Sequence, residues 1–284
     1  MLNCIKMDLY RMFKMKSFYI VGIILAIATL FTTYMSLLDY NMIKEEYEKN
    51  PRVYVQESGS AEEQINLGME VTIPTRPGEM VTVYDQVYAN LHGKFIALFM
   101  VIFAVLFSSS DISSGYIKNI GGQMKNRENL ILSKAAALFV YTVLTMVFYL
   151  IMQIAAQAVC FPEFQVGSVK GLAAYAAVQT LLHYALLLIC MAVMIITRSK
   201  VFSMTFAVLL CMNVMVIVYS TVDKVIAKLG IEDFNLIRYT VTGRMALFEM
   251  SPSAEMCIKA LLIAVFFGAA ATVLSGQIFR KRDI

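Results

Sequence analysis

The chain has 284 residues, of which 59% are apolar and only 15% are charged, and its mean hydropathy is +0.69. Soluble domains carry about 25% charged residues, so lipid rather than water is the expected solvent for most of this chain. The net charge of +4 is small and no segment forms a basic stripe, which argues against nucleic-acid binding. The five cysteines and two histidines lack the spacing of metal ligands, so no metal site is expected.

Six apolar stretches are long enough to cross a bilayer, because a hydrocarbon core of about 30 Å requires roughly 20 helical residues. They predict transmembrane helices at residues 17–38, 91–110, 135–161, 172–197, 201–222 and 258–279. Lys94, near the start of the second stretch, is expected to extend its side chain to the headgroups. The first stretch exceeds a signal-peptide core and lacks a following cleavage site, so it is expected to remain as an anchor. The expected fold is an all-α integral membrane protein in which residues 1–284 form a single transmembrane domain.

The basic residues of the connections predict the orientation of these six helices. One side would carry residues 1–16, 111–134, 197–200 and 280–284, with 13 basic and 4 acidic residues, and the other side 11 and 16. Cytoplasmic connections are enriched in Lys and Arg, so both termini are expected in the cytoplasm.

Three segments outside the spans have distinct expectations. Residues 2–15 place their larger apolar side chains on one helical stripe, which predicts an interfacial amphipathic helix over about 1–16, with a plain basic flank as the alternative. Residues 39–90 form a large outer loop, either a folded cap or a solvated polar loop. Residues 223–257 form a second outer loop that partly folds back on the membrane. Cys160 and Cys257 both lie near the outer face, where they either pair or act as small apolar fillers.

The cytoplasmic connection at residues 111–134 is polar but not low in complexity. Residues 113–120 predict a short helix that the Gly121-Gly122 pair ends. A short helix between two spans is a suitable docking element for a soluble partner.

This connection resembles the coupling segment of permease subunits in type-2, exporter-like ABC transporters. The matching residues are Asp111, Gly115, Lys118, Asn119, Arg127, Ser133 and Lys134. The opening residues 3–11 also look like the N-terminus of that family. The chain departs from the family pattern at Asp111, where Glu is usual, at Tyr116, where Thr is usual, and in lacking a proline before Arg127.

The resemblance implies a permease whose segment 111–127 contacts a separate ATP-binding subunit through Asp111, Gly115, Lys118, Asn119 and Arg127. ATP and Mg²⁺ would bind to that subunit, because this chain has no GxxxxGK[ST] phosphate loop; it is not expected to be an enzyme or to bind a cofactor itself. A second permease, identical or different, would complete the transporter in the cytoplasmic membrane of a bacterium. The family's smaller members suggest export of, or protection against, antimicrobial peptides or drugs.

Polar side chains inside the predicted spans are candidates for a translocation path, because hydrogen-bonding groups in lipid need partners or water. They are Gln153, Gln157, Gln179, His183 and Asn213. Hydrogen bonding between helices is the alternative interpretation.

The sequence also bears on two other classes of function. An intramembrane enzyme is disfavoured, because His183, Cys190 and Cys211 form neither an HExxH motif nor a paired-carboxylate site. The alternative to transport is a multi-span sensor or scaffold that binds an extracellular ligand through loop 39–90.

Overall fold

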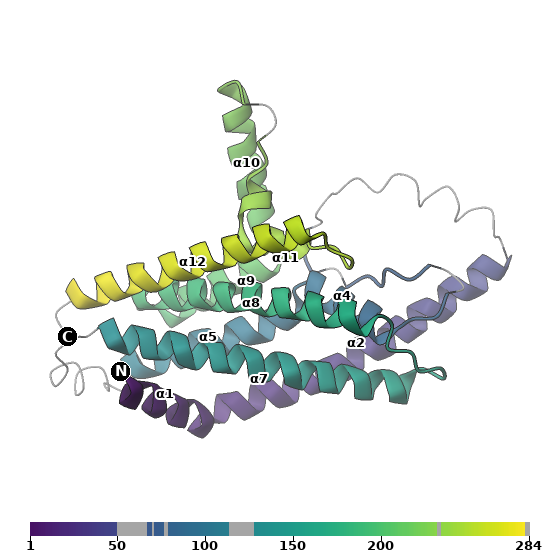
Figure 1. Ribbon diagram of the computed structural model, residues 1–284, viewed down its shortest axis with the longest axis horizontal. Coiled ribbons are helices and arrows are strands. Elements are labelled where there is room, and N and C mark those ends of the chain that lie inside the picture. Colours follow the sequence, from purple (N-terminus) through teal and green to yellow (C-terminus); the bar gives the residue numbers. More distant parts are fainter. Residues whose placement is uncertain (50–66, 70, 77–78, 114–127, 232–233, 282–284) are drawn as a thin grey trace.

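The computed structural model describes residues 1–49, 67–69, 71–76, 79–113, 128–231 and 234–281, and every regular element in these ranges is a helix (Figure 1). The helices are α1 (Leu2–Lys14), α2 (Lys16–Lys49), α4 (Val83–His92), α5 (Phe95–Ser113), α7 (Glu128–Cys160), α8 (Val169–Thr197), α9 (Lys200–Cys211), α10 (Met215–Lys228), η1 (Leu236–Tyr239), α11 (Val241–Ala246) and α12 (Ala254–Lys281).

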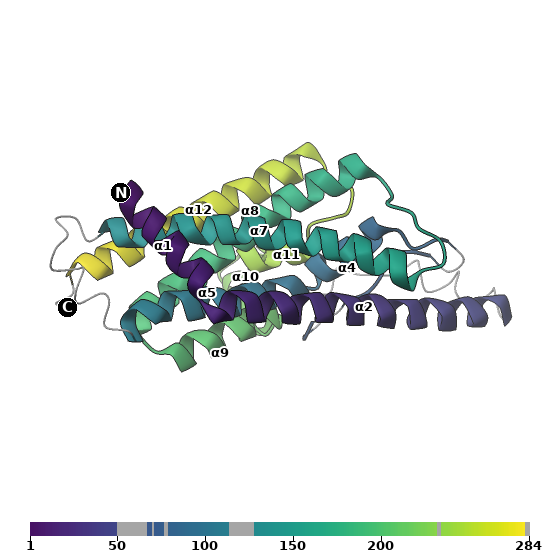
Figure 2. The same ribbon diagram turned by 90° about the horizontal axis from the view of Figure 1, so that it is seen from below.

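Four of these helices, α2, α7, α8 and α12, are individually long and apolar enough to cross a membrane. Two further pairs meet the same criterion together but are bent, α4–α5 by 53° and α9–α10 by 72°. The chain is therefore an all-helical protein with four to six candidate spans. Figures 1 and 2 show the long helices running along one axis, with α1 and the end of α12 at the same end of the bundle.

Helix α8 lies at the centre of the bundle and packs against α5 and α12. Small residues of α12 permit this approach: a Cβ added to Gly268 would lie 3.2 Å from Leu188 Cδ1. On the other side of the core, the Phe103 ring of α5 stacks on the Tyr141 ring of α7, with centroids 4.1 Å apart. The central helices are held by close packing of small and aromatic residues, as expected where lipid surrounds the bundle.

Local signals explain where several helices begin and end. Thr82 and Asp85 form a capping box at the start of α4, in which the Thr82 amide donates to Asp85 Oδ2 at 2.7 Å. Ser168 caps α8. Arg198 ends α8 in the left-handed conformation (φ 54°), and Ser199 caps α9, so the chain reverses within a few residues.

The structure differs from the sequence-based boundaries at several places. Helix α2 continues to Lys49, past the expected end at residue 38, and α4 begins at Val83, so both ends of the expected outer loop 39–90 are helical. The expected span 201–222 is not one straight helix, because it bends between α9 and α10. At 12 residues, α9 is about 18 Å long, well short of a hydrocarbon core of about 30 Å. Helix α10 has no buried residue and stands away from the bundle (Figure 1).

Two smaller expectations are resolved by the structure. The expected helix over residues 2–15 forms as α1, Leu2–Lys14, although its buried residues are Asp8 and Met12 rather than the whole apolar stripe. Cys160 and Cys257 are free cysteines, so the pairing considered between them is not formed.

Candidate functional site

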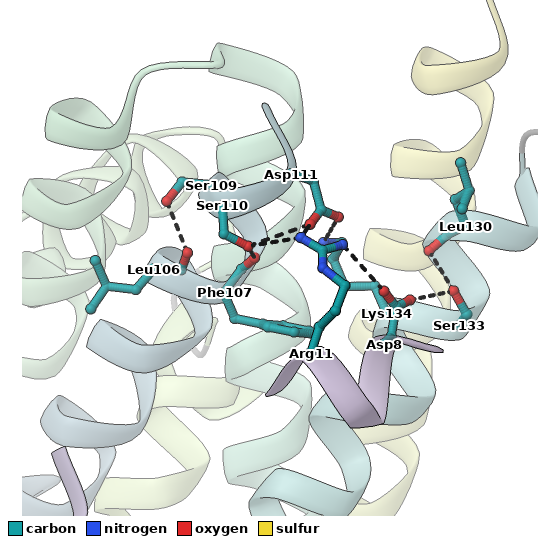
Figure 3. A network of polar contacts seen from close by, with 10 residues as sticks. All are labelled: Asp8, Arg11, Leu106, Phe107, Ser109, Ser110, Asp111, Leu130, Ser133 and Lys134. Carbon is teal, nitrogen blue, oxygen red and sulfur yellow. Dashed lines mark hydrogen bonds and ion pairs between the residues drawn. The ribbon is translucent and has the colours of Figure 1, made fainter. Parts of the chain in front are cut away.

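The ends of α5 and α7 that flank residues 114–127 meet helix α1 in a buried polar network (Figure 3). Asp111 lies in the last turn of α5, and Ser133 and Lys134 lie in the second turn of α7. Asp8 and Arg11 reach the same place from α1, one helical turn apart. The network therefore joins three helices at the end of the bundle that carries α1 and the end of α12.

The carboxylate of Asp111 is the centre of this network. It forms ion pairs with Arg11 Nη2 and with Lys134 Nζ, which bind different carboxylate oxygens. Arg11 Nη1 also lies 3.8 Å from Asp8 Oδ1, and the Ser133 hydroxyl donates to Asp8 Oδ2 at 2.5 Å. Two carboxylates and two cations are thus linked in one chain of contacts from α1 through α5 to α7.

Because these groups are buried, the loss of one of their contacts would cost free energy. Asp8, Asp111 and Lys134 are 2%, 6% and 4% exposed, whereas Arg11 is partly exposed. Burial raises the pKa of Asp8 above its ordinary value of 3.8, against the opposing effects of Lys134 and of the Ser133 hydrogen bond. A buried charge without a partner is costly, so these groups hold α1, α5 and α7 in one arrangement.

The predicted contact residues Gly115, Lys118, Asn119 and Arg127 lie outside the described residues. Asp111, the fifth predicted contact residue, is described, and its carboxylate forms ion pairs with Arg11 and Lys134 of the same chain.

A second polar junction joins the breaks of the two bent helix pairs. Lys94, between α4 and α5, and Asn213, between α9 and α10, both adopt positive φ angles, 60° and 55°. Lys94 Nζ donates to Asn213 Oδ1, and Asn213 Nδ2 donates to the Gly68 carbonyl at 2.9 Å. The expectation that Lys94 extends to the headgroups is wrong for this structure, because the residue is only 2% exposed. Its charge is instead held between the two breaks.

The other predicted path residues are fully buried; the three glutamines bond to neighbouring helices or loops, and His183 bonds within its own helix, α8. Gln153 Nε2 donates to Thr33 Oγ1 at 2.9 Å, and Gln157 Nε2 donates to the Val81 carbonyl at 2.8 Å. On α8, Gln179 Nε2 donates to the Met245 carbonyl at 3.3 Å, and His183 Nδ1 lies 2.7 Å from the Gln179 carbonyl. These contacts match the alternative interpretation, hydrogen bonding between packed segments. The five residues do not converge on one point. The α7 glutamines bond to α2, α4 and the segment before α4, whereas Gln179 on α8 bonds to α11. Asn213 bonds to Lys94.

Sequence reasoning missed several members of these clusters. Asn90 donates to Gln153 Oε1 at 3.2 Å, and Gln86, on the same face of α4, is fully buried. The T-x-x-D capping box before α4 was the signal that could have placed this helix and its polar face. The pairing of Arg11 with Asp111 has no local signal, because the two residues are a hundred positions apart.

Among the described residues, no group of three or more His, Cys, Asp or Glu side chains is arranged to hold a metal ion. The long apolar helices indicate a multi-pass helical membrane protein. Residues 55–284 match the family described as a protein of unknown function, DUF2705, and the chain belongs to that family. The matched range includes Asp111 and Lys134, while Asp8 and Arg11 precede it. No curated protein matches the chain.

Proposed function

We propose that this chain is the membrane-spanning permease subunit of an ATP-driven, ABC-type exporter that works with a separate ATP-binding subunit. One observation carries the proposal. The resemblance to such permeases rests on two pieces of sequence, residues 3–11 and the segment around 111–134. The ion pairs of Asp111 with Arg11 and Lys134 bring these two pieces into contact.

The network suits the transmission of movement from a soluble partner. The Asp111–Lys134 ion pair joins the end of α5 to the start of α7, on either side of residues 114–127. Arg11 links α1 to the same ion pair. A force applied to the segment between them would therefore move α1, α5 and α7 together. In this proposal Asp111 anchors the coupling segment, and Gly115, Lys118, Asn119 and Arg127 make the contact with the ATP-binding subunit.

Each bent pair crosses as one span, which makes six, and the α1 end of the bundle faces the cytoplasm of a bacterium. ATP and Mg²⁺ bind to the partner subunit, and a second permease completes the path. The exported substrates are antimicrobial peptides or drugs, and deletion of the gene is expected to sensitise cells to such compounds.

The coupling proposal is tested by co-expression with a candidate ATP-binding subunit from the same organism. The double substitution Lys118→Glu and Gly115→Trp is expected to abolish co-purification and the stimulation of ATP hydrolysis in liposomes. Lys170→Glu is the matched control, because Lys170 is an exposed lysine in the first turn of α8 at the opposite end of the bundle. Wild-type levels of complex and of coupled hydrolysis in the double variant would refute the assignment.

A further inference from the structure

An apolar groove runs between α2 and α7 on the side of the bundle that α1 enters. It encloses about 620 Å³, which lies within the range of about 300–1,000 Å³ typical of small-molecule sites. Its walls are almost entirely hydrocarbon, from Phe13 and Phe18 at one end to Leu30 and Phe148 at the other. Gly22 leaves part of the wall open, since a Cβ added there would meet nothing within 4 Å.

The groove has the length of one leaflet of a bilayer. From Phe18 to Leu30 helix α2 rises about 18 Å, at about 1.5 Å per residue. Half of a hydrocarbon core of about 30 Å is about 15 Å. The groove lining starts at Phe13, beside the turn from α1 into α2 at Met15, and it ends at Leu30, near the middle of the candidate span Lys16–Glu45. Figure 2 shows α1 turning into α2. The groove therefore covers the leaflet on the α1 side and not the other.

The end of the groove beside α1 combines aromatic rings with positive charge. Phe18 contacts the rings of Phe13 and Tyr19 in edge-to-face geometry, with centroids 5.3 Å apart in each case. Lys14 and Lys16, both exposed, flank the turn at Met15. Rings at the level of the headgroups and lysines beside them are the features that hold an anionic lipid at a membrane surface.

A further aromatic ring in the groove wall lies at the same depth. The Tyr141 ring is 6.0 Å from that of Phe18 and lines the groove on the α7 side. It extends the aromatic belt at this end of the groove to a second helix.

We propose that the groove between α2 and α7 binds one anionic phospholipid from the leaflet on the α1 side. One acyl chain lies along Gly22 and Ala26, and the phosphate lies between Lys14 and Lys16. The site needs no ATP-binding partner, so its failure and the failure of the coupling proposal are distinguishable.

The test counts lipids that stay bound to the purified full chain, by native mass spectrometry after exchange into a mild detergent with phosphatidylglycerol or phosphatidylcholine. Wild-type chain is expected to retain one phosphatidylglycerol in preference to phosphatidylcholine. Gly22→Phe fills the groove and is expected to reduce retention at least tenfold, whereas Ile24→Phe, outside the groove on the same helix, leaves it unchanged. Lys14→Gln and Lys16→Gln are each expected to weaken retention about fivefold.

A second measurement does not depend on a folded variant. Phosphatidylglycerol with a photoreactive acyl chain is expected to label wild-type peptides containing residues 22–30 and 141–148. Labelling spread evenly over the lipid-facing helices would overturn the proposal, as would equal retention of both lipids. If Gly22→Phe separates a dimer into monomers without changing the lipid count, the groove is an interface between two copies and the lipid proposal is wrong.

Discussion

Replacing Asp111 by Asn would leave two cations, Arg11 and Lys134, without their shared counter-charge. The Lys134 side chain is 5% exposed and cannot regain water without disturbing the helix ends, while that of Arg11 is 22% exposed and partly can. Removing one partner of a buried ion pair costs about 3–5 kcal/mol. Because Arg11 is partly solvated, we expect the lower end of that range, about 3 kcal/mol.

A double-mutant cycle separates the ion pair from the general effect of substitution. Lys134→Met alone should also destabilise the chain, because it leaves Asp111 with only Arg11. The combination of Asp111→Asn with Lys134→Met removes both charges, so it should cost less than the sum of the two, by about 2 kcal/mol.

Two fully buried cysteines provide the assay. Cys190 and Cys211 are 0% exposed, so a thiol-reactive dye labels them only when the bundle opens. With Cys4, Cys160 and Cys257 replaced by Ser, the temperature of dye uptake reports unfolding. A loss of about 3 kcal/mol should lower this temperature by roughly 6 °C or more in a chain of this size.

Lys259→Met is the matched control, because the ion pair of Lys259 with Glu255 is formed at 2.5 Å but is exposed on both sides. Such pairs contribute little, so no measurable shift is expected. If Asp111→Asn shifts the unfolding temperature no more than this control does, or if the two network substitutions are simply additive, the reasoning about the anchor is refuted.

Three further predictions concern other parts of the chain. Asn213→Gly tolerates the positive φ but removes the acceptor of Lys94, so it should cost about 1–3 kcal/mol, seen as earlier loss of the monodisperse peak on heated size-exclusion chromatography. The raised pKa of Asp8 means that its contribution to stability is present below its ordinary value of 3.8 and is lost as pH rises through the raised value. The wild-type chain should therefore lose stability relative to Asp8→Asn as a series of melting curves proceeds from acidic to neutral pH. Gly243→Ala would place a Cβ 1.9 Å from the Ile237 carbonyl oxygen, so it should separate η1 from α11 at a cost of about 1–3 kcal/mol in thermal unfolding.

Each of these has a control within the chain. Asn213→Asp keeps an acceptor for Lys94 and should be better tolerated than Asn213→Gly; the reverse order would contradict the role of that hydrogen bond. Gly22→Ala meets no atom within 4 Å and should be neutral or slightly stabilising, unlike Gly243→Ala. A stability difference between Asp8→Asn and wild type that does not change with pH would show that burial does not set the protonation of Asp8.

Hydropathy predicted the helical class and the approximate position of α7, α8 and α12, because long apolar runs need no further information to form helices in lipid. It could not predict the breaks at Lys94 and Asn213, since both lie inside apolar stretches and the cause is a left-handed backbone conformation at each residue. It also placed α4 in a loop, although the Thr82–Asp85 capping box marks that helix in the sequence.

The candidate site was partly predictable for a different reason. The family pattern selected Asp111 and Lys134, and the N-terminal resemblance included Asp8 and Arg11, but neither indicated that the two segments touch. Contacts between residues a hundred positions apart depend on how α1 crosses α7 (Figure 2). No periodic pattern in a single sequence indicates where two helices cross.

Helix α5 connects the two polar junctions. It begins directly after Lys94, at the break that bonds to Asn213, and its last turn carries Asp111. Between them it is continuous, and most of its side chains are buried against α8, α9 and α2. A close-packed helix of this kind cannot absorb a displacement along its own length. We therefore expect movement applied at the Asp111 end to reach the Lys94–Asn213 junction, where the chain bends by 53° and by 72°.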